Sequence, residues 1–249
     1  MHRAVLLLIA VALVAGCEVD GGPAPADTPE PIDLAGLRET VAEVNELHTR
    51  GQAQLATTLD AVRELDLIID EFRAPETIDE ARETWPQVAE VVARAEIDEL
   101  REPFFELAHA VDRARGELRV ALERVDEDWV REALEAEGEA LVVIREYAEE
   151  VDRLARTLIT HWPTYEGITE STEEFVEQRW FYRDAEEAAE AYELAVSGYL
   201  DPLQIAQEEI GEALDRRDDA AERVNEAVAA ASERWEQRPA TPSPGGGDG

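Results

Sequence analysis

Hydrophobic side chains recur in steps of three and four residues along most of this chain, the spacing of an α-helix that buries one face. The first run begins at Leu34, and nine of its twelve positions are apolar. Ala74 and Pro75 follow it, so the pattern predicts one long amphipathic helix that ends there. The run consists of Leu34, Leu37, Val41, Val44, His48, Gly51, Leu55, Thr58, Val62, Leu65, Ile69 and Phe72.

A second helix is predicted from Thr77 to about Val125. Thr77 and Glu80 have the spacing of a capping box, in which a hydroxyl and a carboxylate each satisfy a free backbone N–H. Pro86 and Pro103 each remove a backbone donor, so we expect kinks or short breaks at both. The apolar positions that keep the spacing are Ile97, Leu100, Phe104, Leu107, Val111, Ala114, Leu118, Ala121 and Val125.

A third helix is predicted from near Asp128 to Trp162, where Pro163 should end it. A fourth helix should open at Ser171, which forms a second capping box with Glu174. The apolar positions of the third helix are Val130, Leu134, Leu141, Ile144, Ala148, Val151, Ala155 and Leu158.

The fourth helix should stop near Ser197, because Gly198 follows it and Asp201 with Pro202 is typical of a restart, with Asp as N-cap and Pro at the first helical position. The last stretch, Leu203 to Trp235, then resumes the same spacing through Ile210, Leu214, Ala221, Val224, Val228 and Ala231.

Long helices joined by short turns pack antiparallel, so the sequence predicts an all-α fold: an elongated antiparallel four-helix bundle, or helices packed as in a coiled coil. We expect one bundle domain over residues 32–237, with the last helix broken near 198–202. The alternative is two stacked helical hairpins that bend at Pro86, Pro103 and 198–202.

The first seventeen residues have the layout of a secretory signal peptide: His2 and Arg3, then an apolar stretch from Ala4 to Val14, then small residues. The stretch of eleven residues is too short for a permanent span, which needs roughly 20. Residues 1–16 are therefore predicted to be a signal peptide.

The stretch Val14, Ala15, Gly16, Cys17 resembles the lipobox of bacterial lipoproteins. The resemblance implies that the Cys17 sulfur receives a diacylglycerol, that the chain is cut just before it, and that acyl groups such as palmitate complete an anchor on the extracytoplasmic face of the membrane. The alternatives are a signal peptide with a chance cysteine, or a buried helix that starts the domain. The resemblance covers residues 1–17 only and carries no information about activity.

Both ends of the predicted bundle are flanked by segments rich in proline and glycine. Residues 17–31 combine the lipid attachment site with a flexible tether, and residues 238–249 are a predicted disordered tail. With its one cysteine committed to lipid, the monomer has no disulfide and no cysteine-rich metal site.

The chain is strongly acidic, with 59 Asp and Glu against 23 basic residues, all of them arginine, and a formal net charge of −36. Such a surface repels nucleic acid, which proteins bind through Lys and Arg, so nucleic-acid partners are excluded. The acidity fits either surroundings rich in salt, which screens self-repulsion, or a codon bias toward arginine combined with solvated helix faces.

No motif of catalysis or metal binding stands out. Glu106 and His109 form one Glu-x-x-His, but the spacing places Leu107 and Val111 in the core and this pair on the flank, so we expect no metal and no cofactor. Nucleophile elbows and glycine-rich phosphate loops do not occur in the sequence. We therefore expect no enzyme.

Polar residues interrupt the first hydrophobic run at His48 and Thr58. They predict a polar layer in the core, which either sets the register of the helices or forms a pH-sensitive pocket.

Aromatic residues gather between Trp162 and Tyr182, where six of the fifteen in the chain fall within 21 residues. At a helix end they would form either a recognition site or a hydrophobic plug that closes the bundle. The candidate binding residues are His161, Trp162, Tyr165, Arg179, Trp180, Tyr182 and Arg183.

Together these patterns favour a lipid-anchored scaffold or protein-binding module of the cell envelope, with the membrane and an envelope protein as partners. A helical lipoprotein that binds a small molecule or a cation is the alternative.

Overall fold

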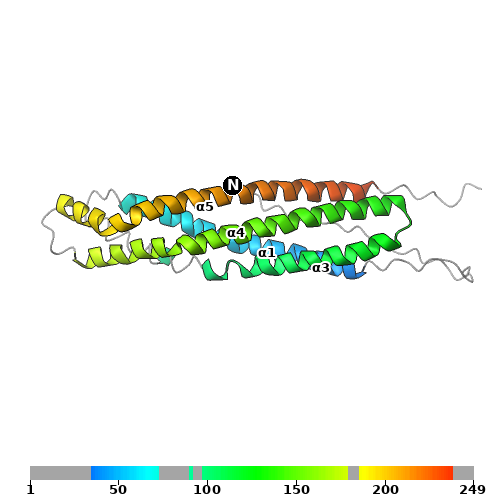
Figure 1. Cartoon of the computed structure of the whole chain (residues 1–249), viewed down its shortest axis with the longest axis horizontal. Helices are drawn as coiled ribbons and strands as arrows, with labels where there is room; N and C mark the ends of the chain where they lie inside the picture. Colours follow the sequence, from blue (N-terminus) through cyan, green and yellow to red (C-terminus); the bar gives the residue numbers. More distant parts are fainter. Residues whose placement is uncertain (1–34, 73–89, 92–96, 179–184, 238–249) are drawn as a thin grey trace, which may run out of the picture. The chain divides into compact units, whose positions relative to one another are not determined.

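The structure is a computed structural model, and it describes residues 35–72, 90–91, 97–178 and 185–237. Helices account for nearly all of them, and no strand occurs within these ranges, so the predicted all-α bundle is confirmed. Cys17, the capping box at Thr77 and Glu80, Pro86 and both flanking segments lie outside the described residues. The elements are α1 (Ala35–Phe72), the 3-10 helix η1 (Ile97–Glu99), α3 (Glu102–Arg124), α4 (Asp128–Gln178) and α5 (Ala185–Glu236) (Figure 1).

The described residues divide into two compact units, and each unit takes one segment from each of the four α-helices. Unit 1 contains residues 35–47, 107–147 and 220–237. Unit 2 contains residues 48–72, 90–91, 97–106, 148–178 and 185–219.

Neighbouring helices pack antiparallel in unit 1, because rising residue numbers on one helix meet falling numbers on the next. Thr40 Oγ1 of α1 donates a hydrogen bond to Glu117 of α3 at 2.9 Å, and Arg223 of α5 donates to Glu146 of α4 at 2.8 Å. The contacts that establish the direction are Glu43–Arg113, Thr40–Glu117, Asp112–Arg145, Leu118–Gly138, Glu146–Arg223 and Glu137–Trp235.

Unit 2 follows the same rule, and its bundle is closed by contacts of α1 with both α4 and α5. Asp66 of α1 accepts hydrogen bonds from Tyr165 of α4 and from Gln207 of α5. The antiparallel contacts are Arg50–Glu106 and Gly51–Phe104 between α1 and α3, and Glu150–Arg216 and His161–Glu209 between α4 and α5.

The predicted hydrophobic positions form the cores of both units. Every position of the first run from Leu37 to Leu65 is buried, including His48, Gly51 and Thr58. All predicted positions from Ile97 to Val125 and from Val130 to Leu158 are buried as well. Burial of each such side chain stabilises the fold by about 1.5–3 kcal/mol, so these faces dominate the energetics.

The break predicted at Pro103 is confirmed. The helical turn Ile97–Glu99 is separate from α3, which begins at Glu102. Pro103 therefore lies in the first turn of α3, where a missing backbone N–H costs nothing because that donor has no partner within the helix.

The predicted end of the third helix at Trp162 and Pro163 is wrong. Helix α4 runs through Pro163 to Gln178, and Ser171 and Glu174 lie inside it rather than at the start of another helix. An interior proline costs about 3 kcal/mol. The helix continues because Pro163 is exposed and the residues that follow it in sequence bury one face again. The buried residues are Tyr165, Ile168, Thr172 and Phe175.

The predicted break at residues 198–202 is also wrong, since α5 passes through Gly198 and Pro202 without interruption. Both residues are exposed, and the buried positions Val196 and Leu203 flank them on the opposite face. Further along α5 the structure corrects two predicted core positions: Leu214 and Ala221 are half-buried, and the buried positions between them are Arg217 and Ala220.

A glycine in the core of unit 2 permits close packing of α1 against α3. Gly51 is buried, and a β-carbon built on it would lie 2.9 Å from Cζ of Phe104, whose side chain is itself fully buried. Gly198 on α5 is the opposite case, because an added β-carbon would meet nothing within 4 Å.

We therefore predict that Gly51→Ala destabilises the protein and that Gly198→Ala stabilises it. Gly51→Ala should cost about 1–3 kcal/mol, because the phenyl ring has no room to move away. Gly198→Ala should gain up to about 1 kcal/mol, because alanine has the higher helix propensity. Denaturant unfolding of the two variants measures both effects, and a shift in the same direction for both would contradict the prediction.

Candidate functional site

The three described residues of the predicted aromatic site lie inside a helix rather than at a helix end. His161, Trp162 and Tyr165 belong to the continuous part of α4 that follows from the correction at Pro163. Arg179, Trp180, Tyr182 and Arg183 lie outside the described residues. The three described residues form contacts within unit 2, and these contacts decide what each of them can do.

Tyr165 and Gln207 both donate hydrogen bonds to Asp66. The Tyr165 hydroxyl donates to Asp66 Oδ1 at 3.0 Å, and Gln207 Nε2 donates to the same oxygen at 3.1 Å. Burial and the adjacent Asp66 carboxylate raise the pKa of Tyr165 well above its ordinary value. Tyr165 is 1% exposed and is thus a neutral donor that joins α4 to α1, a role within the fold rather than a free recognition surface.

Trp162 and His161 are more accessible than Tyr165. The Trp162 ring stacks on Tyr165 with centroids 5.7 Å apart and planes at 29°, and it is half-buried. His161 is also half-buried, and its Nε2 lies 2.7 Å from Glu209 Oε2 on α5. Among the described residues of the predicted site, these are the two side chains that a ligand could reach.

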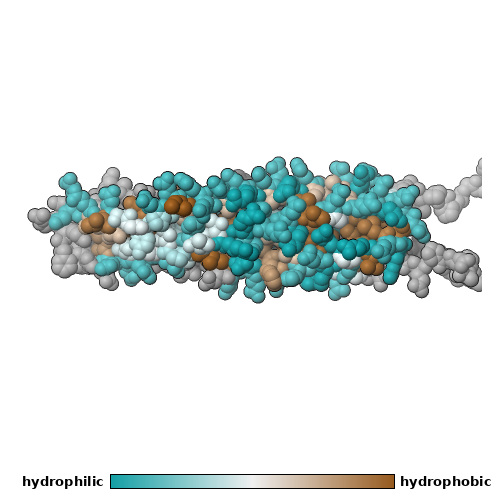
Figure 2. All heavy atoms as spheres, viewed as in Figure 1, coloured by the Kyte–Doolittle hydropathy of each residue, from teal (hydrophilic) through white to brown (hydrophobic). Residues whose placement is uncertain are grey.

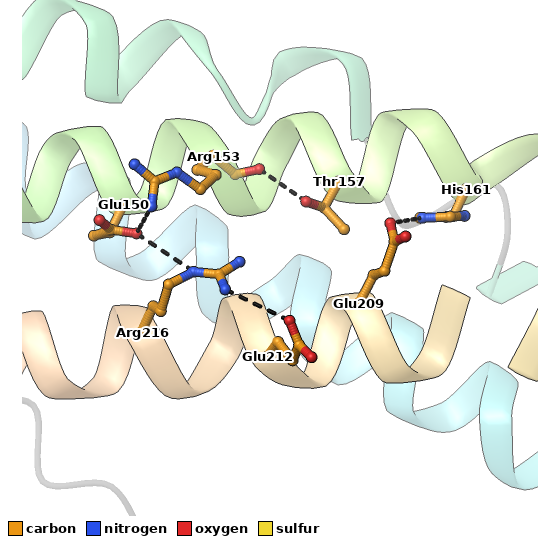
Figure 3. Close-up of polar contacts among 7 residues, drawn as sticks. All are labelled: Glu150, Arg153, Thr157, His161, Glu209, Glu212 and Arg216. Carbon is orange, nitrogen blue, oxygen red and sulfur yellow. Dashed lines mark hydrogen bonds and ion pairs between the residues drawn. The ribbon is translucent and has the colours of Figure 1, made fainter. Parts of the chain in front are cut away.

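Polar contacts continue from His161 along the α4–α5 seam of unit 2 (Figure 3). Glu150 accepts a hydrogen bond from Arg153 at 2.9 Å and lies 3.8 Å from Arg216, which also pairs with Glu212 at 3.7 Å. Each exposed pair contributes up to about 1 kcal/mol. The pairs Glu150–Arg216 and His161–Glu209 join α4 to α5, and the other two pairs each lie within one helix. These contacts present carboxylates and guanidinium groups, but no activated nucleophile.

The predicted polar layer lies in the core of unit 2, where His48 and Thr58 are both buried. His48 Nε2 lies 3.4 Å from Gln52 Nε2, one turn along α1. Burial lowers the pKa of His48 to about 4, because an imidazolium ion loses its hydration there. The ring is therefore neutral at physiological pH.

Sequence reasoning missed a second buried titratable residue, Glu137 in unit 1. It is 1% exposed, its Oε2 accepts a hydrogen bond from Trp235 Nε1 at 3.1 Å, and its Oε1 has no hydrogen-bond partner. Burial raises the pKa of Glu137 to about 7, against the opposing effect of the Trp235 hydrogen bond. The sequence spacing could have identified Glu137, because it lies three residues after Leu134 and four before Leu141, where a core position is expected.

The Glu-x-x-His pair is exposed on α3, as the spacing predicted: Glu106 forms an ion pair with Arg50, and His109 lies one turn further on. Within the described ranges, no group of three or more His, Cys, Asp or Glu side chains is arranged to hold a metal ion. None of the helices in these ranges combines the length and hydrophobicity that crossing a membrane requires.

The surface of the described helices is mainly acidic and carries hydrophobic residues one at a time. Figure 2 shows hydrophobic residues as separate spots among hydrophilic ones on the visible face. Unit 1 has a shallow groove of about 260 Å³, with Leu37, Val120 and Ala121 on its apolar wall and Glu117 and Arg124 among its polar residues. Gly36 and Gly116 complete the lining.

We predict that the buried imidazole makes stability depend on pH in the acid range. Because the folded pKa of His48 is lowered from 6.5 to about 4, only the unfolded chain takes up a proton between these values. The contribution of His48 to the free energy of unfolding, measured as the difference between the wild type and a variant without this imidazole, should therefore fall by about 3 kcal/mol as the pH drops through this window, and level off below it. His48→Phe should lack this part of the pH dependence in denaturant titrations.

His109→Gln is the matched control for this prediction, because His109 is exposed on α3. It should keep the pH profile of the wild type. An equal acid-induced loss of stability in the wild type and in His48→Phe would show that another group causes it.

Comparison with known proteins returns no match for this chain: no family model, no curated protein and no solved structure resembles it significantly. Any argument for its function therefore has to come from its own residues, chiefly the lipobox-like stretch at Cys17 and the contacts described above. The fold itself, an all-α bundle, is compatible with many unrelated activities.

Proposed function

We propose that this protein is a lipid-anchored helical module on the extracytoplasmic face of the cell membrane, where it binds a protein partner of the cell envelope and catalyses no reaction. The observation that carries the proposal is the sequence from Ala4 to Cys17, an apolar stretch followed by Ala15, Gly16 and the only cysteine of the chain. This order of residues is what lipid attachment and cleavage require. The tether at residues 17–31 would then separate the bundle from the bilayer.

The described helices support a binding role rather than a catalytic one. Their buried faces are filled by aliphatic and aromatic side chains, and many outward acids pair with arginines of the same or a neighbouring helix, as Asp152 does with Arg101 and Arg156. Burial raises the pKa of Asp152, but the hydrogen bonds and charges of the two arginines outweigh it and lower the pKa below its usual value. Such ionised, paired carboxylates bind and orient, but they do not transfer protons near neutral pH.

The proposed partner carries a cationic or mixed surface. A chain with a net charge of −36 repels acidic proteins at long range and attracts basic ones, which raises the rate of productive encounters. In the aromatic segment from Trp162 to Tyr182, Tyr165 and Phe175 are buried in the core of unit 2. The other residues of the segment remain our proposed contact region, because aromatic rings with neighbouring arginines are typical of binding hot spots.

We predict that Cys17→Ser releases the protein from the membrane. Serine cannot form the thioether that carries the diacylglycerol, so the uncleaved or differently cleaved chain should leave the carbonate-washed membrane fraction. Immunoblots of membrane and soluble fractions measure the change. Combining Cys17→Ser with Val19→Cys is the control, because it keeps one thiol but moves it; restored anchoring in that variant, or unchanged anchoring of Cys17→Ser, would refute the lipobox assignment.

The partner itself can be detected by replacing Trp180 with a photo-crosslinking amino acid in intact cells. Trp180 lies outside the described residues, and the test rests on its place in the aromatic segment. A recognition site there should give a discrete crosslinked product, whereas the same substitution at Glu139, exposed on α4, should give none. The absence of a product at Trp180, or identical products at both positions, would count against this contact region.

A further inference from the structure

The carboxyl group of Glu137 in unit 1 is buried with only one hydrogen bond among the described residues. It lies on the core face of α4 among Ala133, Leu134, Ala140 and Leu141, which are all fully buried. Within the described chain, its Oε2 accepts a hydrogen bond from Trp235 on the last turns of α5, and its Oε1 has no hydrogen-bond partner. The indole of Trp129 meets Trp235 edge-on, with ring centroids 6.3 Å apart.

An ionised carboxylate does not suit these surroundings. Removing its charge from water costs far more than one indole N–H can return, so buried acids of this kind bind a proton instead. A protonated carboxyl still accepts the Trp235 hydrogen bond through its carbonyl oxygen. The geometry therefore favours the neutral form in the folded state.

Three charged side chains of the surrounding helices have partners other than Glu137. Arg234 of α5 pairs with Glu132, Arg131 of α4 donates to the carbonyls of Leu122 and Val125 at the end of α3, and Glu117 of α3 accepts a hydrogen bond from Thr40 of α1. Burial raises the pKa of Glu137 and the Trp235 hydrogen bond opposes this rise, and no charged side chain of the described residues contributes to the shift.

We propose that Glu137 is a proton-binding site that controls how firmly the last turns of α5 hold to α4 in unit 1. With the proton bound, the neutral carboxyl and the two indoles form one buried contact. When the proton leaves, the bare carboxylate must reach water, and the least costly route is for the Trp235 turns of α5 to separate locally from α4.

The direction of the pH effect follows from linkage. The pKa of Glu137 is raised from 4.5 in the unfolded chain to about 7 in the folded one. The contribution of this contact is fully present below pH 4.5 and is lost as the pH rises through about 7. The end of α5 is thus closed in acid and opens in mildly alkaline surroundings, independently of whether the chain is anchored to lipid.

Hydrogen exchange of the full chain tests this proposal. Backbone amides of residues 224–236 should lose at least about tenfold in protection between about pH 5 and about pH 8, after division by the intrinsic exchange rate. Glu137→Gln, which keeps the shape but not the proton, should show no such change. Glu139→Gln, an exposed neighbour on α4, should behave like the wild type.

Equal pH profiles in the wild type and in Glu137→Gln would overturn the proposal. If Glu137→Gln loses helicity, Trp235→Phe provides the test instead. This variant keeps an aromatic ring but removes the N–H that favours the ionised form of Glu137. Its opening transition should then move to higher pH. A merely structural contact would instead lower the protection at every pH and leave the midpoint unchanged, which would also overturn the proposal.

Discussion

Burial of one continuous apolar face on each of four long helices is the constraint on which the rest of this structure depends. The faces recur in steps of three and four residues, and the core positions from Leu37 to Leu65 and from Ile97 to Val125 are all buried. Side chains at this spacing bury only if each helix has neighbours, so the antiparallel packing follows from the pattern. The outward faces are then free to carry the acids that give the chain its charge.

The sequence predicted the helices and their core positions but not every helix end. Pro163 and Pro202 each predict a helix end, because proline removes a backbone hydrogen bond. The sequence does not show whether the proline ring faces solvent or the core. Both rings face solvent, and Tyr165 and Leu203 resume the buried stripe beyond them, so packing outweighs the loss. Periodicity also cannot pair distant residues, as in the hydrogen bond between Asp66 and Tyr165, which lie 99 positions apart.

The candidate site was predictable only in part, because sequence spacing indicates which residues are buried but not which of them contact each other. His48 and Thr58 were recognised because they interrupt an apolar run, whereas Glu137 was overlooked because charged residues are common in so acidic a chain. Its position between Leu134 and Leu141 is the informative feature. Burial favours the neutral form of both His48 and Glu137, although it moves their pKa values in opposite directions: His48 gives up a proton more easily, and Glu137 holds one more firmly.

The division of all four helices between both units has a consequence for how the chain can be made. Neither unit corresponds to a continuous piece of sequence, and each needs a segment of α5, the last helix. Contacts such as Gln207 with Asp66, 141 residues apart, therefore form only after nearly the whole chain has been synthesised. A chain truncated before α5 completes neither unit, so partial products expose the apolar surface that α5 covers in each unit.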